Sequence, residues 1–74
     1  MADKSDLKDW VVEALRAAGG SSSLIEVAKH IWANHEDELR HSGDLFYKWQ
    51  YDMRWAATVL RNEGVMTEGW ALRK

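Results

Sequence analysis

Apolar residues recur at helical spacing in the first part of the chain. They occupy positions i, i+3, i+4, i+7, i+8 and i+11 and are Leu7, Trp10, Val11, Ala14, Leu15 and Ala18. This pattern is typical of an amphipathic helix with one buried face. Asp3 or Ser5 is placed to cap the start of the helix, and Gly19 is placed to end it in a left-handed conformation. The sequence therefore predicts a first helix that ends before Gly19.

A second helix is predicted to begin after Ser23. Ser23 and Glu26 have the spacing of a capping box, in which each side chain satisfies a free amide of the first turn. The apolar stripe that follows is Leu24, Val27, Ala28, Ile31 and Trp32. The run of acidic residues at 36–38, followed by Leu39, indicates a helix end that frays. The serines at 21–23, ahead of the helix, are compatible with a very short strand.

The third predicted helix spans about residues 45–63, with Asp44 as its N-cap and Gly64 as its stop. Its core stripe consists of Phe46, Trp49, Met53, Ala56 and Leu60, widened by Trp55 and Val59. A second stripe at helical spacing is polar or aromatic and consists of Tyr47, Gln50, Tyr51, Arg54, Thr58 and Arg61. We expect the second stripe to be exposed and to carry any function.

The C-terminal residues predict a small hairpin. Two short alternating runs flank Glu68-Gly69, a plausible two-residue turn, and Val65, Thr67, Trp70 and Leu72 are expected on the inward face. A lone hairpin is marginal in water, so it must pack on the helices. Three helices followed by a hairpin give a mainly α fold of the winged helix-turn-helix type, with a short wing, as a single domain over residues 1–74.

Composition supports a small self-contained domain. The chain has 74 residues, of which 46% are hydrophobic and five are tryptophan, but no cysteine. The absence of cysteine points to a reducing cytoplasm. The polar N-terminus has no signal-peptide pattern, and no apolar run is long enough for a membrane span. The tryptophans either all fill the core, or one or two of them, Trp32 or Trp70 first, lie in an exposed patch that marks a partner site.

Charge is unevenly distributed along the chain. The net charge is −2, which does not favour strong non-specific binding to a polyanion. Residues 1–38 carry four Lys/Arg against eight Asp/Glu, whereas residues 39–74 carry six against four. If the asymmetry is more than chance, a nucleic-acid surface lies in the second half.

The stretch 53–66 resembles the end of the winged-helix domain found at the N-terminus of Mrr-type restriction proteins. The shared pattern is Trp-Ala, a Thr, a Leu, a basic residue, and then Gly with two aliphatic residues that open a strand. Residues 17–21, Ala-Ala-Gly-Gly-Ser, are similar to the first turn of that family. The resemblance covers roughly residues 7–73 and consists mostly of packing and turn positions. It implies a winged-helix fold and a relative of a DNA-binding module.

The chain departs from that family in two respects. Its wing is minimal and lacks a longer basic loop, and the sequence ends at Lys74 without a nuclease domain. Endonuclease activity is therefore not implied, and we expect a protein that is not an enzyme.

The side chains of the third helix, at about 45–63, predict binding to double-stranded DNA, with this helix in the major groove. Arg54 is suited to guanine and Gln50 to adenine. Phosphates or sugars would be held by Tyr47, Lys48, Tyr51, Thr58, Arg61, Arg73 and Lys74, with Arg40 as a further candidate. Asp52 and Glu63 are expected beside this face, where they would repel phosphate. An ordinary solvated helix face is the alternative interpretation.

A second hypothesis is that the same fold serves as a protein-interaction or dimerisation module without DNA binding. No phosphate loop, nucleophile elbow or other catalytic group stands out, so no cofactor and no small-molecule substrate are expected. The spacings between His30, His35 and His41 do not place neighbours on one helical face, and no cysteine completes a zinc site. We therefore expect no metal.

Overall fold

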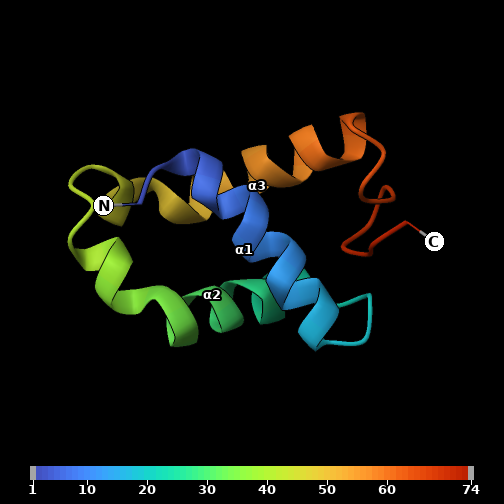
Figure 1. The fold of residues 1–74 in the computed structure, drawn as a ribbon, viewed down its shortest axis with the longest axis horizontal. Helices are drawn as coiled ribbons and strands as arrows, with labels where there is room; N and C mark the ends of the chain where they lie inside the picture. The colour runs from blue at the N-terminus through green and yellow to red at the C-terminus, as the bar shows by residue number, and fades with distance from the viewer. Residues whose placement is uncertain (1, 74) are drawn as a thin grey trace.

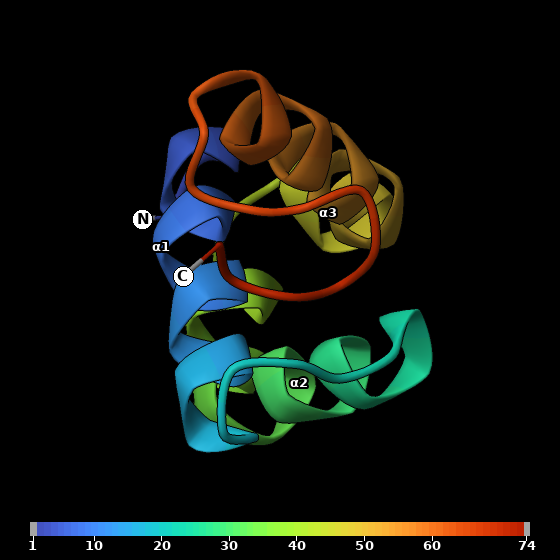
Figure 2. The ribbon, with the colours of Figure 1, turned by 90° about the vertical axis from the view of Figure 1, so that its right-hand side faces the viewer.

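The computed structural model describes residues 2–73 and consists mainly of three helices (Figure 1). They are α1 (Lys4–Ala17), α2 (Leu24–Arg40) and α3 (Leu45–Asn62). Figures 1 and 2 show α1 lying across both of the other helices, and each pair of helices is in contact. This arrangement confirms the mainly helical part of the predicted fold, with its three helices. Within residues 2–73, none of the helices has the length and apolarity needed to span a membrane.

Helix α1 forms as its sequence predicts. Asp3 is the N-cap: its side chain accepts a hydrogen bond from the amide of Ser5, and Asp6 reaches back to the amide of Asp3, which completes a capping box. Its buried residues are Leu7, Trp10, Val11, Ala14 and Leu15. Gly19 follows the helix at φ +86°, a conformation that favours glycine. Because the helix ends at Ala17, Ala18 is exposed rather than part of the buried stripe.

Helix α2 continues further than expected. It begins with Ser23 accepting a hydrogen bond from the amide of Glu26. The predicted fraying over residues 36–39 is wrong, because the helix runs to Arg40 and Leu39 is completely buried. The backbone leaves helical geometry once, at His35 (φ −131°, ψ 20°). The kink lies between the buried Ile31 and the buried Leu39, so a straight-helix stripe read from the sequence stops too early.

Helix α3 supplies the other wall of the core. Asp44 lies at the N-cap position, but it has helical backbone angles and its side chain makes no capping hydrogen bond. Gly64, at φ +81°, follows the helix end as predicted. The buried residues are Leu45, Trp49, Asp52, Met53, Ala56, Ala57 and Leu60. The predicted core residues Phe46, Trp55 and Val59 are only half-buried.

The C-terminal residues form isolated antiparallel bridges instead of the two strands expected for a hairpin. Met66 bridges to Leu72, and Ala71 bridges to Ser21, ahead of α2. The backbone amide of Thr67 donates to Ala71 O at 2.9 Å, and the amide of Leu72 donates to Gly20 O at 2.7 Å. The tail therefore lies against both the end of α3 and the α1–α2 connection (Figure 2).

The inward face of this tail differs from the prediction by one position at its start. Met66 is buried and Val65 is exposed, whereas Thr67, Trp70 and Leu72 are half-buried. The amides of Val65 and Met66 both donate to Leu60 O, so the chain is still turning at the end of α3 when extended structure was expected. A shift of one residue moves a side chain to the opposite face of an extended segment.

Candidate nucleic-acid interface

The polar and aromatic stripe on α3 is exposed along most of its length. Tyr47 and Tyr51 are 83% and 75% exposed. Lys48, Gln50, Arg54 and Thr58 are exposed as well. Because the opposite face of α3 supplies Trp49, Met53 and Ala56 to the core, the stripe is held on a rigid element.

One hydroxyl and one guanidinium group of the stripe already have hydrogen-bond partners within the chain. Thr58 Oγ1 donates to Arg54 O at 3.2 Å, a bond to the preceding helical turn that leaves the oxygen as an acceptor. Arg61 Nε donates to Thr67 O at 3.0 Å, and its Nη2 donates to Gly69 O at 3.1 Å.

Arg61 is half-buried and also lies over the ring of Trp70, with the guanidinium carbon 5.4 Å from the ring centroid. Its position fastens the turn at residues 67–70 onto the end of α3. Arg61 was predicted to contact DNA, and this structural role was not predicted. Carbonyls have no sequence signature, so only the folded tail could show it.

The remaining basic candidates do not belong to α3. Arg73 is exposed, and its backbone amide donates to Val65 O at 2.9 Å. Lys74 lies outside the described residues. Arg40 Nε donates to Glu36 Oε2 at 2.7 Å, and its guanidinium lies 5.2 Å from the ring centroid of Trp32. Arg40 is thus held along α2, at the end of the helix that precedes α3.

The acidic residues expected beside the stripe are arranged differently from the prediction. Asp52 is only 7% exposed, so its carboxylate does not lie on the surface that would face phosphate. It occupies a position between Trp49 and Met53, on the buried side of α3. Glu63 is exposed and accepts a hydrogen bond from Lys8 Nζ at 3.0 Å. Asp52 was therefore wrongly placed on the exposed side, since the stripe pattern does not reveal which polar residue turns inward.

An open groove separates α2 from α3. It consists of two adjoining hollows of about 500 and 330 Å³, both lined by Ile25, Ala28 and Gln50. The larger hollow adds Lys29, Trp32, Phe46 and Trp49, and the smaller one adds Leu24, Tyr51, Met53 and Arg54. Ile25 is 62% exposed. The lining is mainly apolar, and its polar residues are Lys29, Gln50, Tyr51 and Arg54.

Neither tryptophan considered for an exposed patch is fully exposed. Trp32 and Trp70 are half-buried, as is Trp55, whereas Trp10 and Trp49 are buried. Trp32 lines the groove and stacks on Trp49 with ring centroids 6.0 Å apart. The exposure of Ile25 was not predicted. An apolar residue that lies outside the buried stripe of α2 was the signal in the sequence that could have revealed it.

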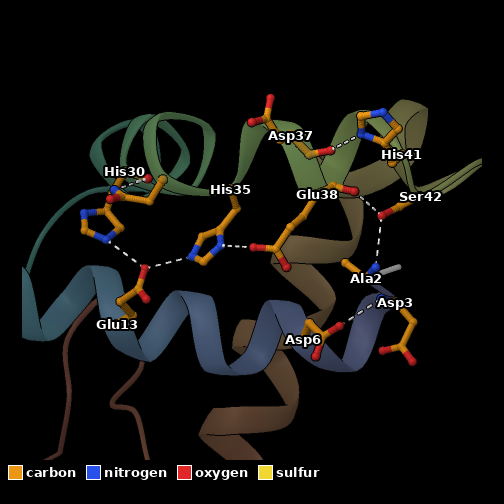
Figure 3. A network of polar contacts seen from close by, with 11 residues as sticks. Ala2, Asp3, Asp6, Glu13, His30, His35, Asp37, Glu38, His41 and Ser42 are labelled. Carbon is orange, nitrogen blue, oxygen red and sulfur yellow. Dashed lines mark hydrogen bonds and ion pairs between the residues drawn. The ribbon is translucent and has the colours of Figure 1, made fainter.

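A histidine network joins the other side of α2 to α1 (Figure 3). Glu13 Oε2 lies 2.9 Å from Nε2 of His35 and 3.1 Å from Nε2 of His30, and Glu38 Oε1 lies 3.0 Å from Nδ1 of His35. The expectation that histidine spacing keeps these rings apart is wrong for His30 and His35. In a straight helix, side chains five residues apart point in directions that differ by about 140°. The helix kinks at His35, however, and Glu13 reaches both rings from α1.

This network shifts two ionisation equilibria. The hydrogen bond with His35 holds the pKa of Glu13 below its ordinary value, against the opposing effect of burial. Burial lowers the pKa of His35, but hydrogen bonds with Glu38 and Glu13 raise it by more, so the net pKa is raised. Across residues 2–73, no group of three or more histidine, aspartate or glutamate side chains is arranged to hold a metal ion.

Comparisons of this chain with models of protein families, with curated proteins and with solved structures found no match.

Proposed function

We propose that this protein is a non-enzymatic winged-helix domain that binds double-stranded DNA, with α3 in the major groove. The observation that carries the proposal is the exposed stripe of α3. It presents aromatic, amide, hydroxyl and guanidinium groups at helical spacing and contains no carboxylate. Its residues are Tyr47, Gln50, Tyr51, Arg54 and Thr58. A rigid helix with such side chains meets the requirements for reading base edges and holding phosphates.

Two further features support the winged-helix part of the proposal. The order of three helices and an extended tail is the order of this fold, and the tail bridges to Ser21, between α1 and α2. The sequence resemblance to the N-terminal domain of Mrr-type restriction proteins points in the same direction. The wing would then be the short turn at residues 67–70 that Arg61 fastens to α3. The cytoplasmic location proposed with it rests on the absence of cysteine.

Within this proposal the side chains have different tasks. Arg54 would donate to guanine and Gln50 would pair with adenine, since these are the bidentate contacts that their geometry favours. Tyr47, Lys48 and Tyr51 would contact the backbone. Arg61 contributes by positioning the wing, and Arg73 would add a phosphate contact beside it. With so few cations, the slope of log K against log salt should be shallow, about −2 to −3.

A titration of the isotope-labelled protein with a mixed-sequence duplex at low salt tests the proposal. Amide shifts should cluster on residues 47–58 and on the turn at 67–70. Arg54→Ala should weaken binding about tenfold or more. Arg16→Ala is the matched control, because it removes the same charge from an exposed position on α1. Equal losses in both variants, or no shifts at high micromolar duplex, would remove the proposal.

The groove between α2 and α3 favours a second candidate function, a protein-interaction or dimerisation module. Its apolar lining and the exposed Ile25 suit an apolar side chain of a partner or of a second copy. Sedimentation over a concentration series tests the dimer, and Ile25→Ser should abolish association if the groove is the contact. A strict monomer at high concentration rules out self-association through this surface.

A further inference from the structure

His35 is placed between two carboxylates, one from each of two helices. Its Nε2 lies 2.9 Å from Glu13 Oε2 on α1, and its Nδ1 lies 3.0 Å from Glu38 Oε1 on α2 (Figure 3). A neutral imidazole has one donor and one acceptor nitrogen, whereas an ionised carboxylate only accepts. Both contacts are therefore hydrogen bonds only when the ring carries two protons and a positive charge.

The indole ring of Trp10 favours the charged form as well. The imidazole stacks on the face of Trp10, with ring centroids 4.0 Å apart and planes inclined by 9°. A cation over an indole face is attracted by the ring electrons, and more strongly where water is excluded. The side chain of His35 is 13% exposed, and this burial by itself disfavours the charged ring. The stacking and the two hydrogen bonds thus act on the same protonated ring.

Charged groups on both α1 and α2 lie near His35. Glu13 of α1 also contacts His30 Nε2 at 3.1 Å. On α2, the carboxylate of Glu36, which follows His35 in sequence, accepts a hydrogen bond from Arg40 at 2.7 Å. The two carboxylates that face His35 are therefore Glu13 and Glu38.

His35 also lies at the point where α2 changes direction. It is the one residue inside α2 with non-helical backbone angles. The segment after it buries Leu39 and leads to Ser42, whose hydroxyl donates to Glu38 O and accepts from the amide of Ala2 at 3.1 Å. The segment then delivers the chain to the start of α3. A contact made by His35 therefore acts on the whole connection between α2 and α3.

We infer that His35 is a proton-dependent clamp: its protonated ring ties Glu13 of α1 to Glu38 of α2 at the kink, and loss of the proton loosens the segment at residues 36–42. The clamp goes beyond the proposed DNA binding, since it depends on the α1–α2 contact and not on the exposed face of α3. Deprotonation turns one ring nitrogen into an acceptor that faces a carboxylate oxygen, so one hydrogen bond is lost and two electron-rich atoms are left in contact.

The pH range of the clamp follows from the two partners. The pKa of His35 is raised above its ordinary 6.5, so its contribution to stability is complete below 6.5 and is lost as pH rises through the folded-state pKa. The pKa of Glu13 is lowered below its ordinary 4.5, so its contribution is present above 4.5 and is lost as pH falls through the folded-state pKa. The clamp is therefore complete in mildly acid solution and weakens toward alkaline pH.

Ring-nitrogen NMR of the histidine-labelled protein tests the protonation state directly. At about pH 6 both ring nitrogens of His35 should carry a proton, and the measured pKa should lie above 6.5. Glu38→Gln should lower that pKa by about half a unit or more, because an uncharged amide replaces the carboxylate. Glu26→Gln, which neutralises a carboxylate on the same helix, is the control. A neutral ring at about pH 6, or an equal response to both variants, overturns the inference.

Denaturant unfolding between about pH 6 and pH 9 tests the consequence for stability. The midpoint of the wild-type protein should fall as pH rises, and His35→Gln should remove most of that fall. His41→Gln is the matched control, because His41 is exposed and its Nδ1 lies 2.7 Å from a backbone carbonyl, Asp37 O. If His35→Gln does not fold, Glu38→Gln, at an exposed carboxylate, should show a reduced fall. A pH-dependent fall that persists unchanged in the variant that folds contradicts the clamp.

Discussion

The two sides of α2 differ sharply in whether their side chains have partners within the chain. Toward α1, Glu13 and Glu38 flank the ring of His35, which also stacks on Trp10, so charges and aromatic faces are matched within the chain. Toward α3, an open groove leaves Ile25 exposed. The first side stabilises the fold, and the second side leaves surface for a partner. Changes on the α1 side should therefore alter stability, whereas changes on the α3 side should alter binding.

The largest expected effect concerns the segment after the kink. Leu39→Ala should lower the free energy of unfolding by about 2–4 kcal/mol, because it leaves a cavity at a fully buried position. Chemical denaturation measures the loss. Ile25→Ala, at an exposed position near the start of the same helix, is the control and should change stability by less than about 0.5 kcal/mol. Equal small effects would mean that residues 36–40 fray in solution.

A smaller loss is expected at the attachment of the tail. Arg61→Ala removes two hydrogen bonds to the carbonyls of Thr67 and Gly69 and the contact with Trp70. We expect a loss of about 1–2 kcal/mol and faster amide exchange at residues 67–72, with little change in α1. Arg16→Ala serves as the charge-matched control. Unchanged exchange in the tail would show that its bridges to Ser21 and Met66 hold it without Arg61.

The polar network should contribute less than either of these sites. Glu13→Gln removes the charged partner of His35 and should cost about 0.5–1 kcal/mol near pH 6, because the carboxylate is half-exposed. The cost should shrink as pH rises through the folded-state pKa of His35. Glu26→Gln is the control for loss of an exposed carboxylate. A cost that stays constant with pH would show that packing, and not the ion pair, is what the substitution disturbs.

The smallest effect on stability is expected on the exposed stripe. Tyr51→Ala should change the free energy of unfolding by less than about 0.5 kcal/mol, since Tyr51 is 75% exposed. The same variant should weaken DNA binding in the duplex titration. Thermal unfolding and the titration together check the comparison. A large loss of stability would place Tyr51 with the structural residues and argue against its role at an interface.

Much of the helical framework could be predicted from local signals. The caps at Asp3 and Ser23 and the stops at Gly19 and Gly64 depend on backbone groups within a few residues, so sequence spacing is enough to find them. The exposed stripe of α3 was found in the same way, because an amphipathic helix shows its two faces in its periodicity.

The candidate sites required contacts between residues far apart in the chain. Glu13 meets His35 across 22 positions, and no periodicity in either helix marks the pair. The inward turn of Asp52 and the choice of Met66 over Val65 depend on what packs against them. Arg61 binds backbone carbonyls, which every residue possesses. For each of these residues the deciding partner lies on another element.

The sequence by itself determined three helices, most of their ends, and the stripe of α3 that faces outward, because these follow from hydrogen bonding and burial within one helical turn or one face. Only the tertiary structure decided the kink at His35, the clamp between α1 and α2, the open groove toward α3 and the fastening of the tail by Arg61. The physical reason is that charge pairing, ring stacking and cavity shape depend on distances between elements, and those distances are set only when the helices pack together.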